Sequence, residues 1–205
     1  QCINTDEYDN IKSVVNDYLK EGIAHTLDET RNLSDSGQFE DISLQQGIRQ
    51  ILYPYEEMEV LNPEWEVILK DIIDSLFEQM SDEEYNILNE EFGTYMVSRA
   101  YEYRQLLEYL VFRYFAKSIY DYDFLGKCQM LVTNFFVIRQ MDIIRWLDNH
   151  REYSFKDRMD VVHIFSRQVE YSEDNIENLY EDFIFDDIFK TDSLIAILWI
   201  DSENI

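Results

Sequence analysis

The stretch Lys127-Cys-Gln-Met-Leu-Val-Thr-Asn-Phe-Phe-Val-Ile-Arg-Gln-Met-Asp-Ile-Ile-Arg-Trp146 decides the fold class. Its residues 128–138 carry no charge, but this run is far shorter than the roughly 20 apolar residues that a membrane-spanning helix needs. We therefore predict a buried core helix over about residues 122–149, with apolar side chains on most of its sides.

A second long helix is expected just before it, over about residues 100–120. Arg104 and Glu108 share one side of that helix, whereas Arg113 and Lys117 fall about half a turn away from Arg104. The helix thus has no single wide polar face, and we expect neighbours to enclose it on most sides. Together the two long helices would form a central hairpin.

Polar capping residues mark further helix starts along the chain. An N-cap side chain accepts a hydrogen bond from the first turn, and proline is well tolerated at the first helical position. These signals predict helices after Thr5, Asn62-Pro63, Ser81 with Glu84, Ser154 and Ser172. Residues 31–38 are a polar connector, and a shorter helix is expected over 39–52, ending before Pro54.

Glycine and proline are scarce, with five and two residues respectively, and no segment shows sustained alternation of apolar and polar residues. The sequence therefore predicts an all-α fold, a multi-helix bundle of roughly seven to nine helices, mostly antiparallel neighbours. We expect one domain over 1–205, with looser helices in 1–60, a core in 61–190 and an apolar tail in 191–205 that docks on the core. Only in this tail is a strand a fair alternative.

The charge is strongly unbalanced, because 43 acidic residues face 17 basic ones and the net charge is −26. Such a chain repels nucleic acids and anionic membranes and attracts a basic protein partner, although the acids could also serve only as a solvated surface. Cys2 and Cys128 are far apart, which favours a reducing compartment and a cytoplasmic location. No signal peptide is visible, and the chain begins at Gln1 without a methionine, as a piece of a longer protein would.

Several arginines fall among apolar neighbours and are candidate binding residues. Arg139, Asp142 and Arg145 follow one another at three-residue steps, so Asp142 could bridge both arginines or leave one free for a carboxylate or phosphate. Arg113 lies between two aromatic residues, where it needs an acidic partner or an anionic ligand.

Polar side chains also gather at a helix junction, where they could line a pocket or simply cap a corner. The residues of interest are Arg167, Glu170 and Asn175. His163, between two apolar residues, is expected to be a hydrogen-bonded core residue rather than a general base. We predict no metal site, since neither Asp121-Tyr-Asp123 nor the acids near 181–187 have convincing ligand spacing. No glycine-rich phosphate loop is present, which excludes a standard Rossmann enzyme.

Four stretches together resemble a known family. They are Leu61–Trp65, Glu108–Phe115, Lys127–Trp146 and Phe165–Asn175. Over about residues 60–185 the chain resembles the C-terminal half of bacterial flagellin lysine-N-methylases. The resemblance implies methyl transfer from S-adenosylmethionine to lysine side chains of flagellin. It also implies an iron–sulfur cluster held by cysteines in the first half of such proteins, which this chain does not reproduce.

On this resemblance, the chain would be the helical C-terminal part of a methyltransferase and not sufficient alone for catalysis. It would contact substrate or cofactor through Arg113, Arg139, Asp142, Arg145, Arg167, Glu170 and Asn175. Glu170, Asp142 and Glu108 are candidates for the base that neutralises the substrate lysine. The main alternative is a non-catalytic acidic helical module that docks a basic protein partner, and a metal-dependent all-α enzyme is the third. The sequence does not predict an oligomeric state.

Overall fold

The structure, a computed structural model, describes residues 42–203, and every regular element in this part is helical. The expected helix after Thr5, the connector 31–38, His25 and Cys2 lie outside the described residues, which belong to the compact unit Ile42–Ile205. The α-helices are α3 (Leu44–Glu56), α4 (Pro63–Ile72), α5 (Asp82–Met96), α6 (Ala100–Arg113), α7 (Ser118–Asp121), α8 (Phe124–Asp148), α9 (Phe155–Phe165), α10 (Glu173–Phe185) and α11 (Thr191–Glu203). Two π-helical segments, η3 (Ile73–Glu78) and η6 (Ser166–Glu170), and three short 3₁₀ segments, η4 (Val97–Arg99), η5 (Phe115–Lys117) and η7 (Asp187–Phe189), complete the fold. The predicted all-α class is confirmed.

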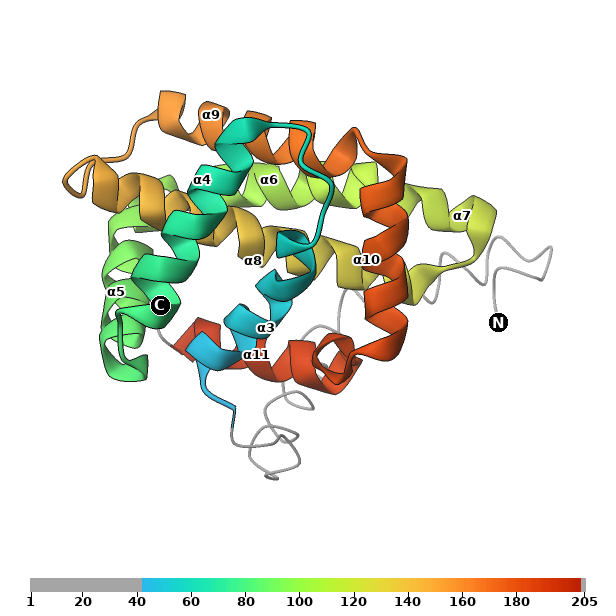
Figure 1. The fold of residues 1–205 in the computed structure, drawn as a ribbon, viewed down its shortest axis with the longest axis horizontal. Helices are drawn as coiled ribbons and strands as arrows, with labels where there is room; N and C mark the ends of the chain where they lie inside the picture. The colour runs from blue at the N-terminus through green and yellow to red at the C-terminus, as the bar shows by residue number, and fades with distance from the viewer. Residues whose placement is uncertain (1–41, 204–205) are drawn as a thin grey trace, which may run out of the picture. The chain divides into compact units, whose positions relative to one another are not determined.

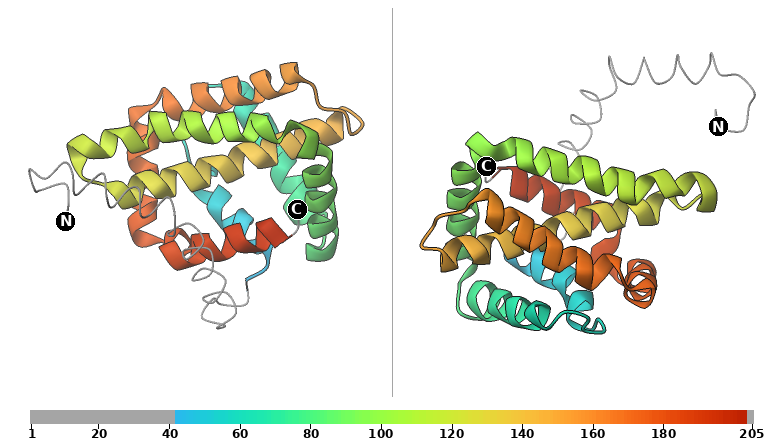
Figure 2. Two further views of the ribbon diagram at one scale, coloured as in Figure 1. Left: turned by 180° about the vertical axis from the view of Figure 1, so that it is seen from behind. Right: turned by 90° about the horizontal axis from the view of Figure 1, so that it is seen from above.

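Helix α8 is the central element of this unit, as its sequence predicts. It contacts α3, α4, α6, α9, α10 and α11, and Figures 1 and 2 show helices on several sides of it. Met130, Val137, Met141 and Ile143 are at most 1% exposed. No helix among residues 42–203 is both long enough and apolar enough to span a membrane.

The expectation that the preceding helix is enclosed is wrong. Only Glu102, Leu106 and Leu110 of α6 are buried, and Phe112 is 79% exposed. The helix is also shorter than predicted, because it ends at Arg113 and the chain continues through η5 into α7. On the solvent side, its apolar residues flank the exposed Arg104–Glu108 ion pair. The positions of the charges alone therefore do not show which side of the helix is buried.

The predicted helix starts in the described residues are confirmed. Asn62 accepts a hydrogen bond from the Glu64 amide at the start of α4, and Ser172 accepts one from the Asn175 amide at the start of α10. Ser81 and Ser154 begin α5 and α9, each in a reciprocal capping box. These local signals fix where four helices begin.

Helix α3 continues to Glu56, whereas the sequence predicted that it would end before Pro54. Proline lacks an amide hydrogen and so costs the helix one backbone hydrogen bond. Tyr55 compensates for that loss, since it is fully buried and its hydroxyl donates to Oδ1 of Asn134 in α8 at 2.7 Å. The helix begins at Leu44, where Ser43 is the N-cap, and Phe39 lies outside the described residues.

The apolar tail forms a helix, α11, and not a strand. Leu194, Ala196 and Ile197 are buried, and α11 packs against α3 and α8. Gly47 of α3 allows this approach, because a Cβ atom there would lie 2.9 Å from side-chain atoms of Ile197. The division into segments 1–60, 61–190 and 191–205 stays a prediction, since residues 1–41 lie outside the described part.

Candidate functional site

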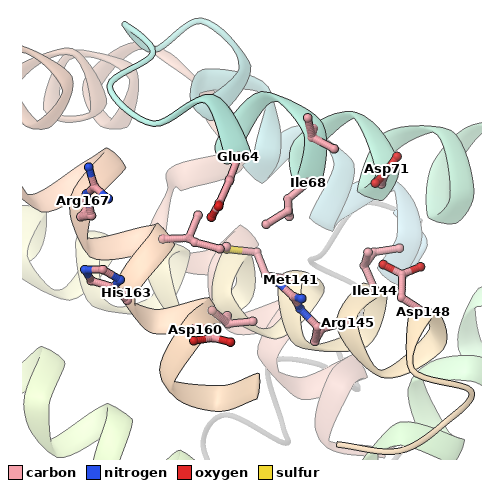
Figure 3. Close-up of a pocket in the computed structure, with 13 residues that line it drawn as sticks. Glu64, Ile68, Asp71, Met141, Ile144, Arg145, Asp148, Asp160, His163 and Arg167 are labelled. Atoms are coloured by element: carbon pink, nitrogen blue, oxygen red, sulfur yellow. The ribbon is translucent and has the colours of Figure 1, made fainter. Parts of the chain in front are cut away.

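A groove between α4, α8 and α9 combines charged and apolar side chains. Its volume is about 640 Å³, which lies in the range of ligand-binding clefts. Figure 3 shows Glu64, Ile68 and Asp71 projecting from α4 toward side chains of α8 and of the α9–η6 segment. Helix α4 and the consecutive helices α8 and α9 therefore build one site.

The floor of the groove is apolar. Met141 and Ile144 from α8 lie beside Val161 and Ile164 from α9, and all four are buried. Ile68 contributes a further apolar surface from α4. Such a floor suits an aliphatic chain, since it removes methylene groups from water without leaving a polar group unpaired.

The rim carries both signs of charge. Its four carboxylates are Glu64, Asp71, Asp148 and Asp160, and only Asp160 has an ion-pair partner within residues 42–203, the exposed Lys156. Its basic side chains are Arg145, His163 and Arg167. Carboxylates at the edge of an apolar slot favour a ligand with a long apolar stem and a cationic end.

Arg145 and Arg167, both predicted as binding residues, lie in this groove. Neither side chain forms a hydrogen bond or an ion pair within the part of the chain that the structure describes, so both are available to a ligand. Arg167 lies in η6, and Figure 3 places its guanidinium near the end of the groove marked by Glu64.

Arg139 lies on another side of α8, away from the groove. Its Nη2 donates to Oδ1 of Asn89 at 3.0 Å and lies 3.6 Å from Oδ1 of Asp201. Arg139 is only 3% exposed. In this geometry the arginine joins α8 to α5 and α11, and its predicted role in binding stays untested.

Asp142 does not bridge Arg139 and Arg145, contrary to the expectation from their spacing. It is fully buried and pairs with Arg158 of α9, while it also accepts hydrogen bonds from the hydroxyls of Tyr103, at 2.8 Å, and Tyr153. Burial acts to lower the pKa of Arg158, but the Asp142 carboxylate raises it above its ordinary value. The contacts of this pair join α6, α8 and α9.

Glu102 extends this buried network. Arg158 Nε lies 3.5 Å from its carboxylate, and Arg99 forms two hydrogen bonds to the same group, at 2.7 and 3.0 Å. The Arg158 guanidinium also lies over the Tyr103 ring, 4.3 Å from its centroid. These contacts offset much of the cost of burying the charges, and Nη2 of Arg158 is its one guanidinium nitrogen left without a hydrogen bond within residues 42–203.

Glu170 and Arg113, both predicted site residues, form a second cluster between η6 and α6. The Glu170 carboxylate accepts hydrogen bonds from Tyr109 at 2.7 Å, Tyr114 at 3.1 Å and Ser166 at 2.6 Å. Arg113 Nε lies 3.6 Å from it. Burial, together with the hydrogen bond to Glu170, raises the pKa of Tyr109 to about 12. Three donors and an arginine therefore already surround the Glu170 carboxylate.

Asn175 faces the loop before α4 and not the groove. Its side chain accepts from the Glu59 amide at 3.0 Å and donates to the Glu59 carbonyl at 3.1 Å. Gln168 binds the same loop, where its Oε1 accepts from the amides of Leu61 and Asn62. Asn175 therefore fixes the chain that enters α4. Among the predicted arginines Arg113, Arg139 and Arg167, the groove contains Arg167 whereas the other two lie elsewhere, so the three do not converge on one cleft.

Sequence reasoning missed most of the groove. His163 is exposed and lines it, so the expectation of a core histidine is wrong. Glu64, Asp71, Asp148 and Asp160 are unremarkable in a chain with 43 acids. The spacing of two of them could have indicated the site. Glu64 and Asp71 are seven residues apart, so they lie on one side of α4 with Ile68 between them.

No group of three or more histidine, cysteine, aspartate or glutamate side chains is placed to hold a metal ion in residues 42–203. Cys128 is the single cysteine of this range, whereas an iron–sulfur cluster commonly requires four thiolates. These residues therefore do not fit such a cluster.

Comparison with families of known proteins gives a match over residues 1–197, to the family described as FliB lysine N-methylase C-terminal domain. The chain belongs to this family. The resemblance inferred from the four sequence stretches is thereby confirmed, and the groove is a feature of a FliB C-terminal domain. No curated protein and no solved structure matches the chain.

Proposed function

We propose that this FliB C-terminal domain helps to bind the basic protein substrate of a lysine N-methylase, with the α4–α8–α9 groove as the contact site. The observation that carries the proposal is the joining of an apolar floor with four rim carboxylates. A lysine side chain matches this arrangement, because its four methylene groups can lie on the floor while the ammonium group reaches an acid.

The net charge of the chain supports the same assignment. A net charge of −26 attracts a lysine-rich protein over long range and speeds its encounter with the groove. Arg145 and Arg167 would donate hydrogen bonds to backbone carbonyls or to acidic side chains that flank the lysine. Flagellin, in the cytoplasm, is the substrate that the family resemblance implies.

S-adenosylmethionine would be the methyl donor in the whole enzyme. Its sulfonium-bound methyl group supplies the electrophile for lysine, and a neutral amine is the reacting form of that lysine. The residues described above would bind and orient the lysine-bearing segment. Glu170 and Asp142 are held by hydrogen bonds, so neither provides a free base in residues 42–203.

Peptide titration by fluorescence anisotropy tests the proposal. A flagellin-derived lysine peptide should bind the chain, and the same peptide with acetyl-lysine should bind at least about tenfold more weakly because its charge is removed. Glu64→Gln, Asp71→Asn and Asp148→Asn together should abolish this preference. Moderate salt should reduce the affinity without eliminating it.

The matched control is Glu83→Gln, Glu90→Gln and Glu177→Gln, three exposed acids outside the groove. Both triple variants remove three negative charges, so equal losses of affinity would show charge steering alone and overturn the groove assignment. That outcome, with binding lost at moderate salt, would instead favour the alternative of a non-catalytic acidic module that docks a basic partner. Titration of S-adenosylmethionine by calorimetry tests separately whether this chain contacts the methyl donor.

A further inference from the structure

The outer face of α6 is apolar and has no neighbour in the described unit. Leu106 and Leu110 face α8, whereas Tyr101, Val111 and Phe112 on the opposite side are 56%, 42% and 79% exposed. Figure 2, in its left view, shows α6 running along the surface in front of α8. A helix with apolar residues on both sides usually buries both.

The charges on this face form a short, balanced pattern. Arg104 Nε and Glu108 Oε1 are 3.0 Å apart at the middle of the exposed side, and both side chains are more than half exposed. Residues 97–120 contain four basic residues, Arg99, Arg104, Arg113 and Lys117, but only two acidic ones, Glu102 and Glu108. Because Arg99 pairs with Glu102 and Arg113 with Glu170, the exposed face is close to neutral in a chain of net charge −26.

We propose that a second copy of this chain binds here, with the two α6 helices antiparallel about a two-fold axis level with Leu106. In a two-fold contact each residue meets its counterpart reciprocally, so the face must complement itself. Around that axis Arg104 of one copy lies opposite Glu108 of the other. Four charges at the centre are then paired across the interface.

Apolar residues also pair in the same register. Successive residues of a helix are 100° apart, so Tyr101 and Phe112 lie along one edge of the face and Ala100 and Val111 along the other. Phe112 of one copy therefore meets Tyr101 of the other, and Val111 meets Ala100. A hollow of about 500 Å³, lined by Ala100, Tyr103, Leu107 and Val111, lies along the second edge.

The charge distribution explains why this face, and not another, would meet its copy. Two chains of charge −26 repel each other over most of their surfaces, and α6 is where acids do not oppose acids. A helix of 14 residues is about 21 Å long, which gives an interface near the lower size limit for specific complexes. We expect a reversible dimer that forms at micromolar concentration and becomes tighter as salt screens the repulsion.

Sedimentation velocity of the full chain over a concentration series tests the proposal. A concentration-dependent dimer should appear, with a lower dissociation constant at moderate than at low salt. Arg104→Glu alone, or Glu108→Arg alone, places like charges opposite one another and should weaken the dimer at least about tenfold. The double variant with both changes should restore it, and mixing the two single variants should give a heterodimer.

Phe112→Lys should also weaken the dimer, and the matched control is Phe185→Lys, because Phe185 of α10 is likewise 79% exposed. Circular dichroism confirms that each variant is folded. A chain that stays monomeric at all concentrations and salt levels overturns the proposal, as does a dimer that Phe185→Lys weakens and Phe112→Lys does not. Peptide binding in the groove is a separate measurement, so the two proposals fail independently.

Discussion

The Nδ2 amide of Asn89 in α5 donates a hydrogen bond of 2.8 Å to Oδ1 of Asp201 in α11, across 112 positions of the chain. The same side chain accepts hydrogen bonds from Arg139 in α8. One neutral amide therefore bonds to both members of the buried Arg139–Asp201 ion pair, and its donor and acceptor ends match them.

Replacement of Asn89 by alanine should destabilise the chain by about 2 kcal/mol, because Arg139 and Asp201 each lose a buried hydrogen bond. Urea unfolding followed by circular dichroism measures the change. Glu90→Gln on the same helix is the control, since Glu90 is exposed and should leave the midpoint unchanged. Equal midpoints for both variants would contradict this account.

Arg158→Met should cost about 3 kcal/mol, because it leaves the buried Asp142 carboxylate without its cation. Lys156→Met on the same helix also removes an ion pair, but that pair with Asp160 is exposed. The unfolding midpoint should therefore fall for Arg158→Met and stay constant for Lys156→Met. A similar shift in both variants would show that burial does not govern these pairs.

Alkaline pH should destabilise the fold through Tyr109, which is partly shielded from solvent. The pKa of Tyr109 is about 12 in the folded chain, whereas an unfolded tyrosine titrates near about 10. Between these values the folded state retains the phenol proton that the unfolded state has lost, so stability is full below about pH 10 and falls as pH rises toward about 12.

A tyrosinate absorbance titration checks the cause of this shift. Comparison with Tyr109→Phe isolates the Tyr109 signal, and Glu170→Gln should lower the pKa of Tyr109 because it removes the adjacent negative charge. Part of the shift should remain, since burial is the largest contribution. An unchanged Tyr109 titration in Glu170→Gln would exclude the carboxylate as a cause.

Asn175→Ala should release the loop before α4. The amide of Glu59 loses its acceptor, so its hydrogen exchange should accelerate by at least about tenfold. Ser172→Ala removes the N-cap of the same helix without touching that loop and serves as the control. If Ser172→Ala accelerates exchange at Glu59 equally, the helix as a whole, and not the Asn175 side chain, protects the loop.

Local patterns predicted the helix starts at Asn62, Ser81, Ser154 and Ser172, because a cap is decided by residues within one turn. The partner of Asp142 could not be predicted in that way. Arg139 and Arg145 are its neighbours along α8, but Arg158 reaches it from the next helix, after a turn at Asn149–Tyr153 whose geometry the sequence does not reveal. Packing between helices, and not spacing along one helix, chose the pair.

The candidate site was only partly predictable for the same reason. Arg145 stood out because it follows apolar neighbours, and Arg167 because it lies in a polar run at a helix junction, and both lie in the groove. The acids of the rim did not stand out, since identical residues cover the remaining surface. Only the approach of α4 to α8 and α9 distinguishes Glu64 from an ordinary solvated glutamate.

The π-helical segment η6 contains one residue more per turn than an α-helix would. This extra residue lets a single continuous helix present Arg167 to the groove and Glu170 to the tyrosines of α6. Deleting one residue within 166–170 would rotate everything after it by about 100° and leave α9 unchanged. The number of residues in this turn, rather than their type, therefore sets the angle around the helix axis between the groove and the Glu170 cluster. A homologue one residue shorter here would lose the Glu170 cluster and keep the α4, α8 and α9 parts of the groove.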